Sequence, residues 1–321
     1  YVPAGGAPLL STALMGVVPA RLAGVEEIVV VTPPPAHPSV VLAATVAGAH
    51  RILQLGGAQA VAAVAYGTET VQPVDVVAGP GNLFVQLAKR EVVGVVGIDT
   101  LAGPTEVVVL ADGSAPARWV AADLLAQAEH APDAAAILVT DDGRLAQAVE
   151  EELQRQLQAL PRREVARESL ERWGACVLCA DLGRQGVDLV NELAPEHVEI
   201  MAADALTLAG RVTRAGAVFV GPYTPEALGD YAAGTNHILP TNGAARFASA
   251  VGVHTFLRHT SLLVAGPQAL RRLSGVVMDM ARAEGLEAHA RSVALRLQEM
   301  DGQPAGPQGS PAPEGPEEMP V

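Results

Sequence analysis

A helix-like stretch of the sequence ends in two polar side chains that could share one ligand. In LLAQAEHAPD, which runs from Leu124 to Asp133, Gln127 and His130 stand three residues apart. On a helix this spacing stacks both side chains on one face, where an amide oxygen and an imidazole nitrogen can reach the same small target. A helix end finished by polar residues is the more ordinary interpretation of the pair taken alone.

Three further stretches place an acidic residue near a histidine at a turn or at a helix end. They are NELAPEHVEI with Glu196 and His197, EALGDYAAGTNHILPT with Asp230 and His237, and ARAEGLEAHARS with Glu284 and His289. With Gln127 and His130 they form a set of nitrogen and oxygen donors that suits Zn²⁺ or a similar divalent ion. The sequence has no HExxH motif, and spacing alone does not show that these residues converge.

Helical and β-strand patterns alternate along the elements that must position these residues. Helical patterns at 11–25, with Ser11 as the expected N-cap, 39–50, 58–67 and 82–94 alternate with strand patterns at 26–34, 51–57 and 74–81. A second series has strand patterns at 106–113, 134–142, 176–182, 197–202 and 217–221, with helices that end at His130 and span 144–160. Such alternation is typical of parallel sheets built from βαβ units.

The predicted fold class is α/β, with two Rossmann-like parallel-sheet domains and a C-terminal helical dimerisation arm. We expect the domains to span 1–105 and 106–249, the second carrying the metal and catalytic residues, and the arm to span 250–300. The arm is expected to pack against a partner because it is short and apolar on one side. Residues 301–321 are dominated by proline and glycine and are expected to form a disordered tail.

The composition limits the classes of protein to consider. Half of the residues are apolar but only 3% are aromatic, so the core must be built from Ala, Val and Leu. A net charge of −14 argues against binding to nucleic acid or to an anionic membrane. No uninterrupted apolar run reaches the length of a membrane span, and Pro3, Pro8 and Pro19 are expected to interrupt any apolar helix in the uncharged first twenty residues. We therefore expect a soluble protein without a signal peptide.

The two cysteines have the C-x-x-C spacing of a redox or metal motif. Cys176 and Cys179, however, lie in a strand-like pattern, where residues three apart point to opposite faces. We expect two small residues of a buried core and a reducing compartment.

From YVPAGG to about Leu297 the chain resembles the histidinol dehydrogenase family. The resemblance rests on YVPAGG, GGAQAVAAVAYGTETV, VAGPGN, LAGPTEV, QAEHAPD, LAPEHVEI, GDYAAGTNHILPT and AEGLEAHARSV, all in family order. It implies a cytoplasmic homodimer with NAD and one Zn²⁺ per subunit, which oxidises L-histidinol through L-histidinaldehyde to L-histidine. Family members carry a further region before the YVP motif, so the chain is expected to be an N-terminally truncated member. Thr105 stands where the family commonly has Ser, and the opening lacks a basic residue often found after the family's glycines.

The resemblance also assigns roles to individual positions. The implied metal ligands are Gln127, His130, Asp230 and His289, with His289 and Glu284 acting across the homodimer. Glu196 and His197 match the acid–base residues. The implied substrate contacts are Thr105, Gln127, His130, Glu196, His197, Asp230, His237, Glu284 and His289. Domain 1–105 would bind NAD through Tyr1, Gln59 and Asn82.

Elementary chemistry favours one of two routes for a double oxidation of an alcohol. The intermediate aldehyde becomes a hydride donor again either as a thiohemiacetal or as the hydrate formed with water. Neither cysteine is a credible nucleophile, so the sequence favours water, activated by Glu196, with His197 as the base for the alcohol and diol protons. Two alternative functional interpretations remain. One is a metal-dependent hydrolase that uses the same ligands without a dinucleotide, and the other is an inactive fragment or paralogue.

Overall fold

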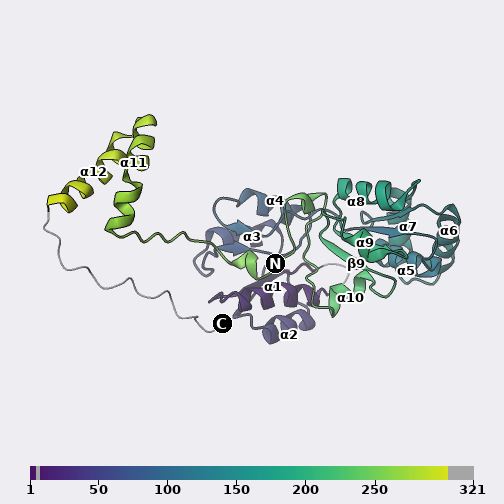
Figure 1. The fold of residues 1–321 in the computed structure, drawn as a ribbon. Coiled ribbons are helices and arrows are strands. Elements are labelled where there is room, and N and C mark those ends of the chain that lie inside the picture. The colour runs from purple at the N-terminus through teal and green to yellow at the C-terminus, as the bar shows by residue number, and fades with distance from the viewer. Residues whose placement is uncertain (5–7, 303–321) are drawn as a thin grey trace. The chain divides into compact units, whose positions relative to one another are not determined.

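The computed structural model describes residues 1–4 and 8–302, and the chain divides into two compact units, Tyr1–Arg258 and His259–Val321 (Figure 1). Each unit is described by itself. Of the predicted tail 301–321, residues 301 and 302 belong to the last helix, and the remainder lies outside the described residues. Among the described residues, no helix is both long and apolar enough to cross a bilayer.

The beginning of the first unit contains two small parallel sheets with helices packed beside them. Strand β1 (Val29–Thr32) pairs with β2 (Arg51–Gln54), and β3 (Val76–Val77) pairs with β4 (Gly97–Ile98). The helices are α1 (Leu10–Leu22), α2 (Pro38–Ala47), α3 (Gly57–Tyr66) and α4 (Leu83–Glu91). Small alanines and valines fill two apolar clusters, one between α1, α2 and β1 and one between α3, α4 and β3. Because aromatic residues are few, these cores consist of small side chains, and the helices pack closely on the strands.

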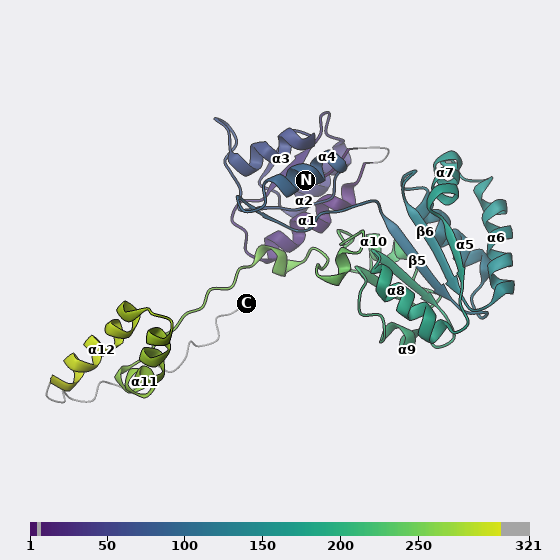
Figure 2. The same cartoon turned by 90° about the horizontal axis from the view of Figure 1, so that it is seen from above.

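A five-stranded parallel sheet forms the rest of this unit, in the order β7-β6-β5-β8-β9. The strands are β5 (Glu106–Ala111), β6 (Ala135–Thr140), β7 (Ala175–Leu178), β8 (His197–Met201) and β9 (Ala217–Val220). Helices α5 (Ala117–Ala128) and α6 (Gly143–Leu157) pack on one face, and α8 (Val187–Leu193) and α9 (Ala205–Ala209) on the other (Figure 2). After Glu106, central β5 is apolar from Val107 to Ala111, because both of its faces are covered. The predicted α/β class with parallel sheets is confirmed.

Several short helices were not predicted from the sequence. They are α7 (Arg163–Trp173), α8, α9 and α10 (Glu226–Tyr231). Most of them are one or two turns long, and so short a segment does not establish a helical period in the pattern of apolar residues.

Helix α1 corrects two expectations. It begins at Leu10, so Ser11 is a buried residue of the first turn and not the N-cap. Pro19 lies inside the helix and does not interrupt it. Its missing N–H leaves the carbonyl of Met15, four residues earlier, without its usual donor. The side chain of Asn236 replaces that donor, with Nδ2 at 2.8 Å from the Met15 oxygen.

The expectation of two buried core cysteines is also wrong. Strand β7 is an edge strand, with β6 as its neighbour, and Cys176 is exposed while Cys179 is half-buried. Burial and nearby acidic groups raise the pKa of both thiols. A thiol with a raised pKa is a poor nucleophile at neutral pH.

A buried ion pair connects β3, β4 and α4. The ammonium of Lys89, which is fully buried, contacts a carboxylate oxygen of Asp99 and donates to the Gly79 carbonyl at 2.9 Å. The second Asp99 oxygen accepts the Gly79 N–H at 2.8 Å. This network fixes the loop from β3 to α4, in which Asn82 lies.

We expect Lys89→Met to lower the free energy of unfolding by about 3–5 kcal/mol, because it leaves the Asp99 carboxylate buried without its counter-ion. Urea unfolding curves measure this. The control is Arg172→Met, which removes an exposed pair with Glu168 and should cost about 0–1 kcal/mol. Equal losses in the two variants would contradict the role assigned to the buried pair.

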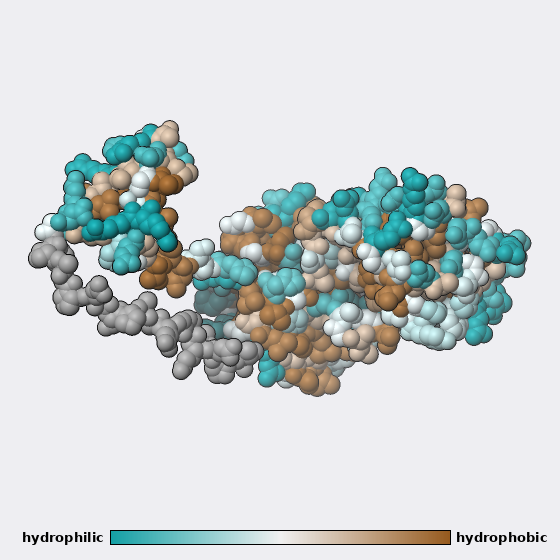
Figure 3. Space-filling model, in the orientation of Figure 1, coloured by the Kyte–Doolittle hydropathy of each residue, from teal (hydrophilic) through white to brown (hydrophobic). Residues whose placement is uncertain are grey.

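The second unit contains a pair of packed helices, α11 (Pro267–Ala283) and α12 (Glu287–Gly302). Apolar side chains reach its surface (Figure 3). On α11, Leu273, Val276, Val277 and Met280 are all exposed, and their spacing places them on one face of the helix.

Candidate active site

The site is built where β5 and β8 begin. Thr105 precedes β5 and Glu196 precedes β8, and the pairing of Val107 with His197 brings these two strand starts together. The Thr105 hydroxyl donates to Glu196 Oε2 at 2.5 Å, and the Glu106 N–H donates to the same oxygen at 3.1 Å. The Glu196 carboxyl is therefore held by the adjacent strand, although 91 residues separate it from Thr105.

Gln127 joins this network from the last turn of α5. Its side chain is fully buried, and Nε2 donates to the Thr105 hydroxyl oxygen at 3.0 Å. Its carbonyl oxygen Oε1 is buried and has no hydrogen-bond partner among the described residues. The amide orientation follows from this network, because the Thr105 hydroxyl already donates to Glu196 and can only accept from Gln127.

His130 lies just beyond the end of α5, which stops at Ala128. Its ring is exposed, and Nδ1 is 3.0 Å from the Ala126 carbonyl oxygen, so Nδ1 carries the proton and Nε2 has a free lone pair. Burial raises the pKa of Asp230 on α10, while His237 and His130 act in the opposite direction.

Glu196 and His197 are a buried acid–base pair, 7% and 3% exposed. Burial raises the pKa of Glu196 to about 8, against the hydrogen bonds from Thr105 and Glu106 that lower it. Burial lowers the pKa of His197 to about 3, so its ring is neutral. His197 Nδ1 donates to the Glu106 carbonyl at 3.3 Å, and Nε2 is buried without a partner among the described residues. One nitrogen thus fixes the ring and the other is free to accept a proton.

Helix α10 adds a carboxyl group that sequence reasoning missed. Ligand atoms of Glu226, Asp230 and His197 lie within 4.8 Å of one another. Glu226 is buried, its Oε2 is 3.7 Å from His197 Nδ1, and burial raises its pKa to about 9. The spacing of Glu226 and Asp230, four residues apart, was a signal for one helix face, but α10 itself was not predicted.

His237 has both ring nitrogens engaged. Nδ1 is 3.1 Å from the Asp230 carbonyl oxygen, and Nε2 is 3.1 Å from the Thr12 hydroxyl on α1. His237 therefore places α1 against the segment that carries Asp230. Its predicted contact with substrate stays a prediction.

Of the three predicted cofactor residues, Gln59 and Asn82 lie at the amino ends of helices, and Tyr1 contacts one of these ends. The Gly57 N–H, at the start of α3, donates to the Tyr1 hydroxyl at 3.0 Å, and Gln59 is exposed in the same turn. Asn82 is the N-cap of α4, where its Oδ1 accepts the Val85 N–H at 3.2 Å. Free N–H groups at helix amino ends favour negatively charged groups such as phosphates.

Glu284 and His289 lie in the second unit. Glu284 follows α11 directly, His289 is in the first turn of α12, and both side chains are exposed. Their assignment as ligands contributed across a dimer stays a prediction.

The Thr105 hydroxyl group joins Glu196 and Gln127 in the observed network, so a variant without this group tests the role of the network. We expect Thr105→Val, which keeps the shape and removes the hydroxyl, to lower turnover by about 10-fold to 100-fold, the effect of losing a hydrogen bond to an ionisable group. Thr105→Ser keeps the hydroxyl and is the matched control, with near-normal turnover. Steady-state kinetics compare the two, and equal activity of both variants would contradict the role of the hydroxyl.

Fold and site together define an α/β protein whose buried acid–base pair and unpartnered nitrogen and oxygen donors are typical of an enzyme. The sequence profile of histidinol dehydrogenase matches residues 1–297, and this chain belongs to that family. It is 54% identical to a histidinol dehydrogenase of Moorella thermoacetica, with 92% of this chain and 70% of the relative covered. It is 53% identical to one of Synechococcus sp., with 94% and 70% covered.

Solved structures agree. A histidinol dehydrogenase crystal structure from Elizabethkingia anophelis superposes with a TM-score of 0.91 at 37% identity, over 94% of this chain and 70% of that one. An acetylating aldehyde dehydrogenase from Geobacillus thermoglucosidasius has a TM-score of 0.50 at 13% identity, over 83% of this chain and 75% of that one. The second likeness concerns the fold alone.

Proposed function

We propose that this chain is a zinc-containing, NAD-dependent histidinol dehydrogenase that oxidises L-histidinol through L-histidinaldehyde to L-histidine, in histidine biosynthesis. The observation that carries the proposal is the buried Glu196–His197 pair, held by Thr105 and Glu106, in a chain that matches the family over residues 1–297. The overall reaction consumes one water and two NAD⁺ and yields two NADH and three protons.

The residues at the site fit a zinc ion. Gln127 has a buried, unpartnered carbonyl oxygen, and the Nδ1 contact of His130 leaves its Nε2 available. Asp230 adds a carboxylate near His130 and His237. Two imidazoles, a carboxylate and an amide form a donor set that zinc accepts, so we propose Gln127, His130, Asp230 and His289 as its ligands.

We propose that residues 1–105 and residues 106–249 form two Rossmann-like domains. The first of them would bind NAD. The support is the position of Tyr1, Gln59 and Asn82 at the amino ends of α3 and α4. When bound, zinc would hold the imidazole and amine of the substrate, and NAD would accept one hydride in each oxidation.

In the alcohol oxidation His197 accepts the hydroxyl proton at Nε2. The ring is neutral and its Nδ1–H is fixed on the Glu106 carbonyl, so Nε2 presents its lone pair in one orientation. The imidazolium that forms is stabilised by carboxyl groups of Glu196 and Glu226, whose oxygens are 3.6 and 3.7 Å from Nδ1. These neighbours offset part of the cost of a charge in a buried position.

In the aldehyde oxidation the Glu196 carboxylate removes a proton from water, which adds to the aldehyde carbon. A carboxylate whose pKa is raised to about 8 is a stronger base than an ordinary one near neutral pH. As the water oxygen adds, the His197 imidazolium formed in the alcohol oxidation returns its proton to the aldehyde oxygen, which gives the diol. Neutral His197 then takes a hydroxyl proton of the diol as the hydride leaves.

This assignment predicts the pH dependence of the aldehyde step. Below its pKa of about 8 Glu196 is neutral and cannot accept a proton, so kcat/KM for L-histidinaldehyde should rise with pH and level off above about 8. The slope is about tenfold per pH unit on the acidic side for one essential ionisation. Initial rates of NADH formation between pH 6 and 9.5 measure it. A profile that is flat through this range would remove Glu196 as the base.

The proposed C-terminal arm completes the site in a homodimer. The exposed apolar face of α11 supports an arm that packs on another chain, because an unpartnered apolar helix face is unfavourable in water. We propose that Glu284 and His289 reach the substrate and the metal of the partner subunit.

The direct test of the function is NADH formation by the purified chain with L-histidinol and Zn²⁺, followed by absorbance. Two NADH per histidinol consumed would establish both oxidations. One NADH per histidinol would limit the enzyme to the alcohol step. Hydrolysis of an amide or ester substrate without any NADH would favour a metal-dependent hydrolase instead.

A further inference from the structure

Two carboxyl groups next to the site, those of Asp123 and Glu199, have no part in the proposed reaction. Glu199 is 1% exposed and lies two residues after His197 on β8, so both side chains point to the same face of the sheet. Asp123 is half-buried on α5, about one turn before Gln127. Acidic side chains in such places need partners, because a buried charge without one is costly.

Glu199 contacts the beginning of α10. Its Oε1 accepts the N–H of Glu226 at 2.6 Å in a buried contact. Glu226 is the first residue of α10, so this N–H has no acceptor within the helix. The N-cap residue, Pro225, has no side-chain oxygen that could accept it. Glu199 therefore supplies from β8 the cap that the helix's own sequence lacks.

Helix α10 carries two groups of the candidate site. Oε2 of Glu226 lies 3.7 Å from Nδ1 of His197, and Asp230, a proposed zinc ligand, follows one turn later on the helix. The helix has only 6 residues, and so short a helix is not stable by its own hydrogen bonds. Its place at the site therefore depends on tertiary contacts such as the one with Glu199.

Asp123 and Glu199 are joined by a hydrogen bond that requires a proton. Their side chains bond to each other although both are acids, and an ionised carboxylate can only accept. Burial raises the pKa of both carboxyls. The bond between them raises the pKa of Glu199 further and lowers that of Asp123, so Glu199 keeps the proton and donates it. Oε2 of Glu199 receives no hydrogen bond from the described residues, as expected of the oxygen that carries the proton.

The other groups that face this pair cannot replace the shared proton. Burial raises the pKa of Glu226 on α10 to about 9 and lowers the pKa of His197 on β8 to about 3, so both are neutral near pH 7. The residues paired with Glu199 on the neighbouring strands β5 and β9 are the apolar Val109 and Phe219. None of these neighbours supplies a cation.

We propose that Glu199 is a positioning residue of the active site, which fixes the beginning of α10 while Asp123 accepts its proton. Through this contact Glu199 keeps Glu226 beside His197 and keeps Asp230 at the place of the metal. The part that concerns the metal rests on the proposed function, whereas the anchoring of α10 does not.

Two variants separate the reach of the side chain from its charge. Glu199→Gln keeps an oxygen that can accept the Glu226 N–H and gains an amide group that can donate to Asp123 in place of the proton. Glu199→Asp keeps the acid but is too short to reach the Glu226 N–H. We expect the Glu226 amide to exchange with solvent about 10-fold faster in Glu199→Asp, the effect of losing one hydrogen bond, and at an unchanged rate in Glu199→Gln.

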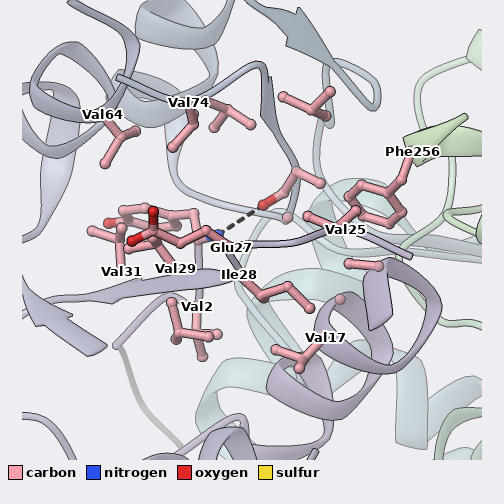
Figure 4. A pocket seen from close by; sticks show the side chains of 18 of the residues that line it. Val2, Val17, Val25, Glu27, Ile28, Val29, Val31, Val64, Val74 and Phe256 are labelled. Carbon is pink, nitrogen blue, oxygen red and sulfur yellow. Dashed lines mark hydrogen bonds between the residues drawn. The ribbon is translucent and has the colours of Figure 1, made fainter. Parts of the chain in front are cut away.

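Zinc affinity is measured by competition with a chelator, without NAD or substrate. We expect a loss of about 10-fold in Glu199→Asp, the lower end of the range for residues that support a ligand, and none in Glu199→Gln. Val64→Ala is the control for lost stability alone. Val64 is buried in the apolar cluster between α3, α4 and β3 and lines a cavity of about 490 Å³ (Figure 4). Its truncation should leave zinc affinity and the Glu226 amide unchanged.

Glu199→Gln also tests the shared proton. In the folded chain Glu199 keeps its proton above the pH at which an unfolded glutamate loses it, so stability falls as the pH rises through this window. Between about pH 5 and 7 the unfolding equilibrium constant of the unchanged chain should therefore rise about tenfold more per pH unit than that of Glu199→Gln. Urea unfolding at several pH values measures the difference.

Equal exchange of the Glu226 amide in Glu199→Asp and in the unchanged chain would overturn the anchoring, and so would faster exchange in Glu199→Gln. Normal zinc affinity in Glu199→Asp despite faster exchange would overturn the link to Asp230, and equal pH slopes would overturn the shared proton. If Glu199→Asp does not fold, Glu199→Gln decides alone, because it must keep both the protected amide and the zinc. An unchanged chain that binds no zinc would contradict the proposed function instead, and amide exchange, which needs no zinc, would still decide the anchoring.

Discussion

Glu196→Gln is expected to lower the rate of L-histidinaldehyde oxidation by about 10²-fold to 10⁴-fold, the usual effect of a positioned general base. Glutamine can still accept the Thr105 hydroxyl and the Glu106 N–H through its carbonyl oxygen, so the site should keep its shape. It cannot take a proton from water. The alcohol oxidation should fall less, because His197 removes that proton.

The measurement compares NADH formation from L-histidinol and from L-histidinaldehyde, with bound zinc determined in the same samples. Glu192→Gln, an exposed position four residues earlier, is the matched control and should behave as the unchanged protein. Equal losses in the two half-reactions would contradict the division of roles between Glu196 and His197.

The second large effect is expected from His289→Ala. Removing a residue that merely supports a metal ligand already lowers metal affinity by about 10-fold to 100-fold. Removing a proposed ligand should therefore reduce zinc affinity by at least this factor. Turnover should fall with it. Metal content after dialysis and NADH formation measure both, and His259→Ala, an exposed histidine in the same unit, is the control. Unchanged zinc content would remove His289 from the ligand set.

Mixing equal amounts of the Glu196→Gln and His289→Ala variants, with L-histidinaldehyde oxidation as the readout, tests whether His289 acts across the dimer. In a mixed dimer one of the two sites combines an intact Glu196 with an intact His289 of the other chain, so about a quarter of all sites should recover at full exchange. No recovery in samples whose subunits have exchanged would place His289 and Glu196 of one chain in the same site.

The local pattern of the sequence predicted much of the sheet architecture. Alternation of apolar strands and helices located β5, β6, β8 and β9, because the period of apolar residues is a property of neighbours in the chain. It could not place β7 at an edge, so the exposure of Cys176 was missed. Nor could it show that the carbonyl of Met15 finds a donor in Asn236, which keeps α1 intact at Pro19.

The sequence by itself determined the parallel α/β class, the residue types of the candidate site and, through its motifs, the family. Only the tertiary structure decided which of these residues meet. Thr105 and Glu196 share a hydrogen bond because β8 lies beside β5, although β6 and β7 come between them in the chain. Glu226 enters the site because α10 packs there. The pKa values of Glu196 and His197 move apart for the same reason, since burial depends on what the whole fold places around a side chain.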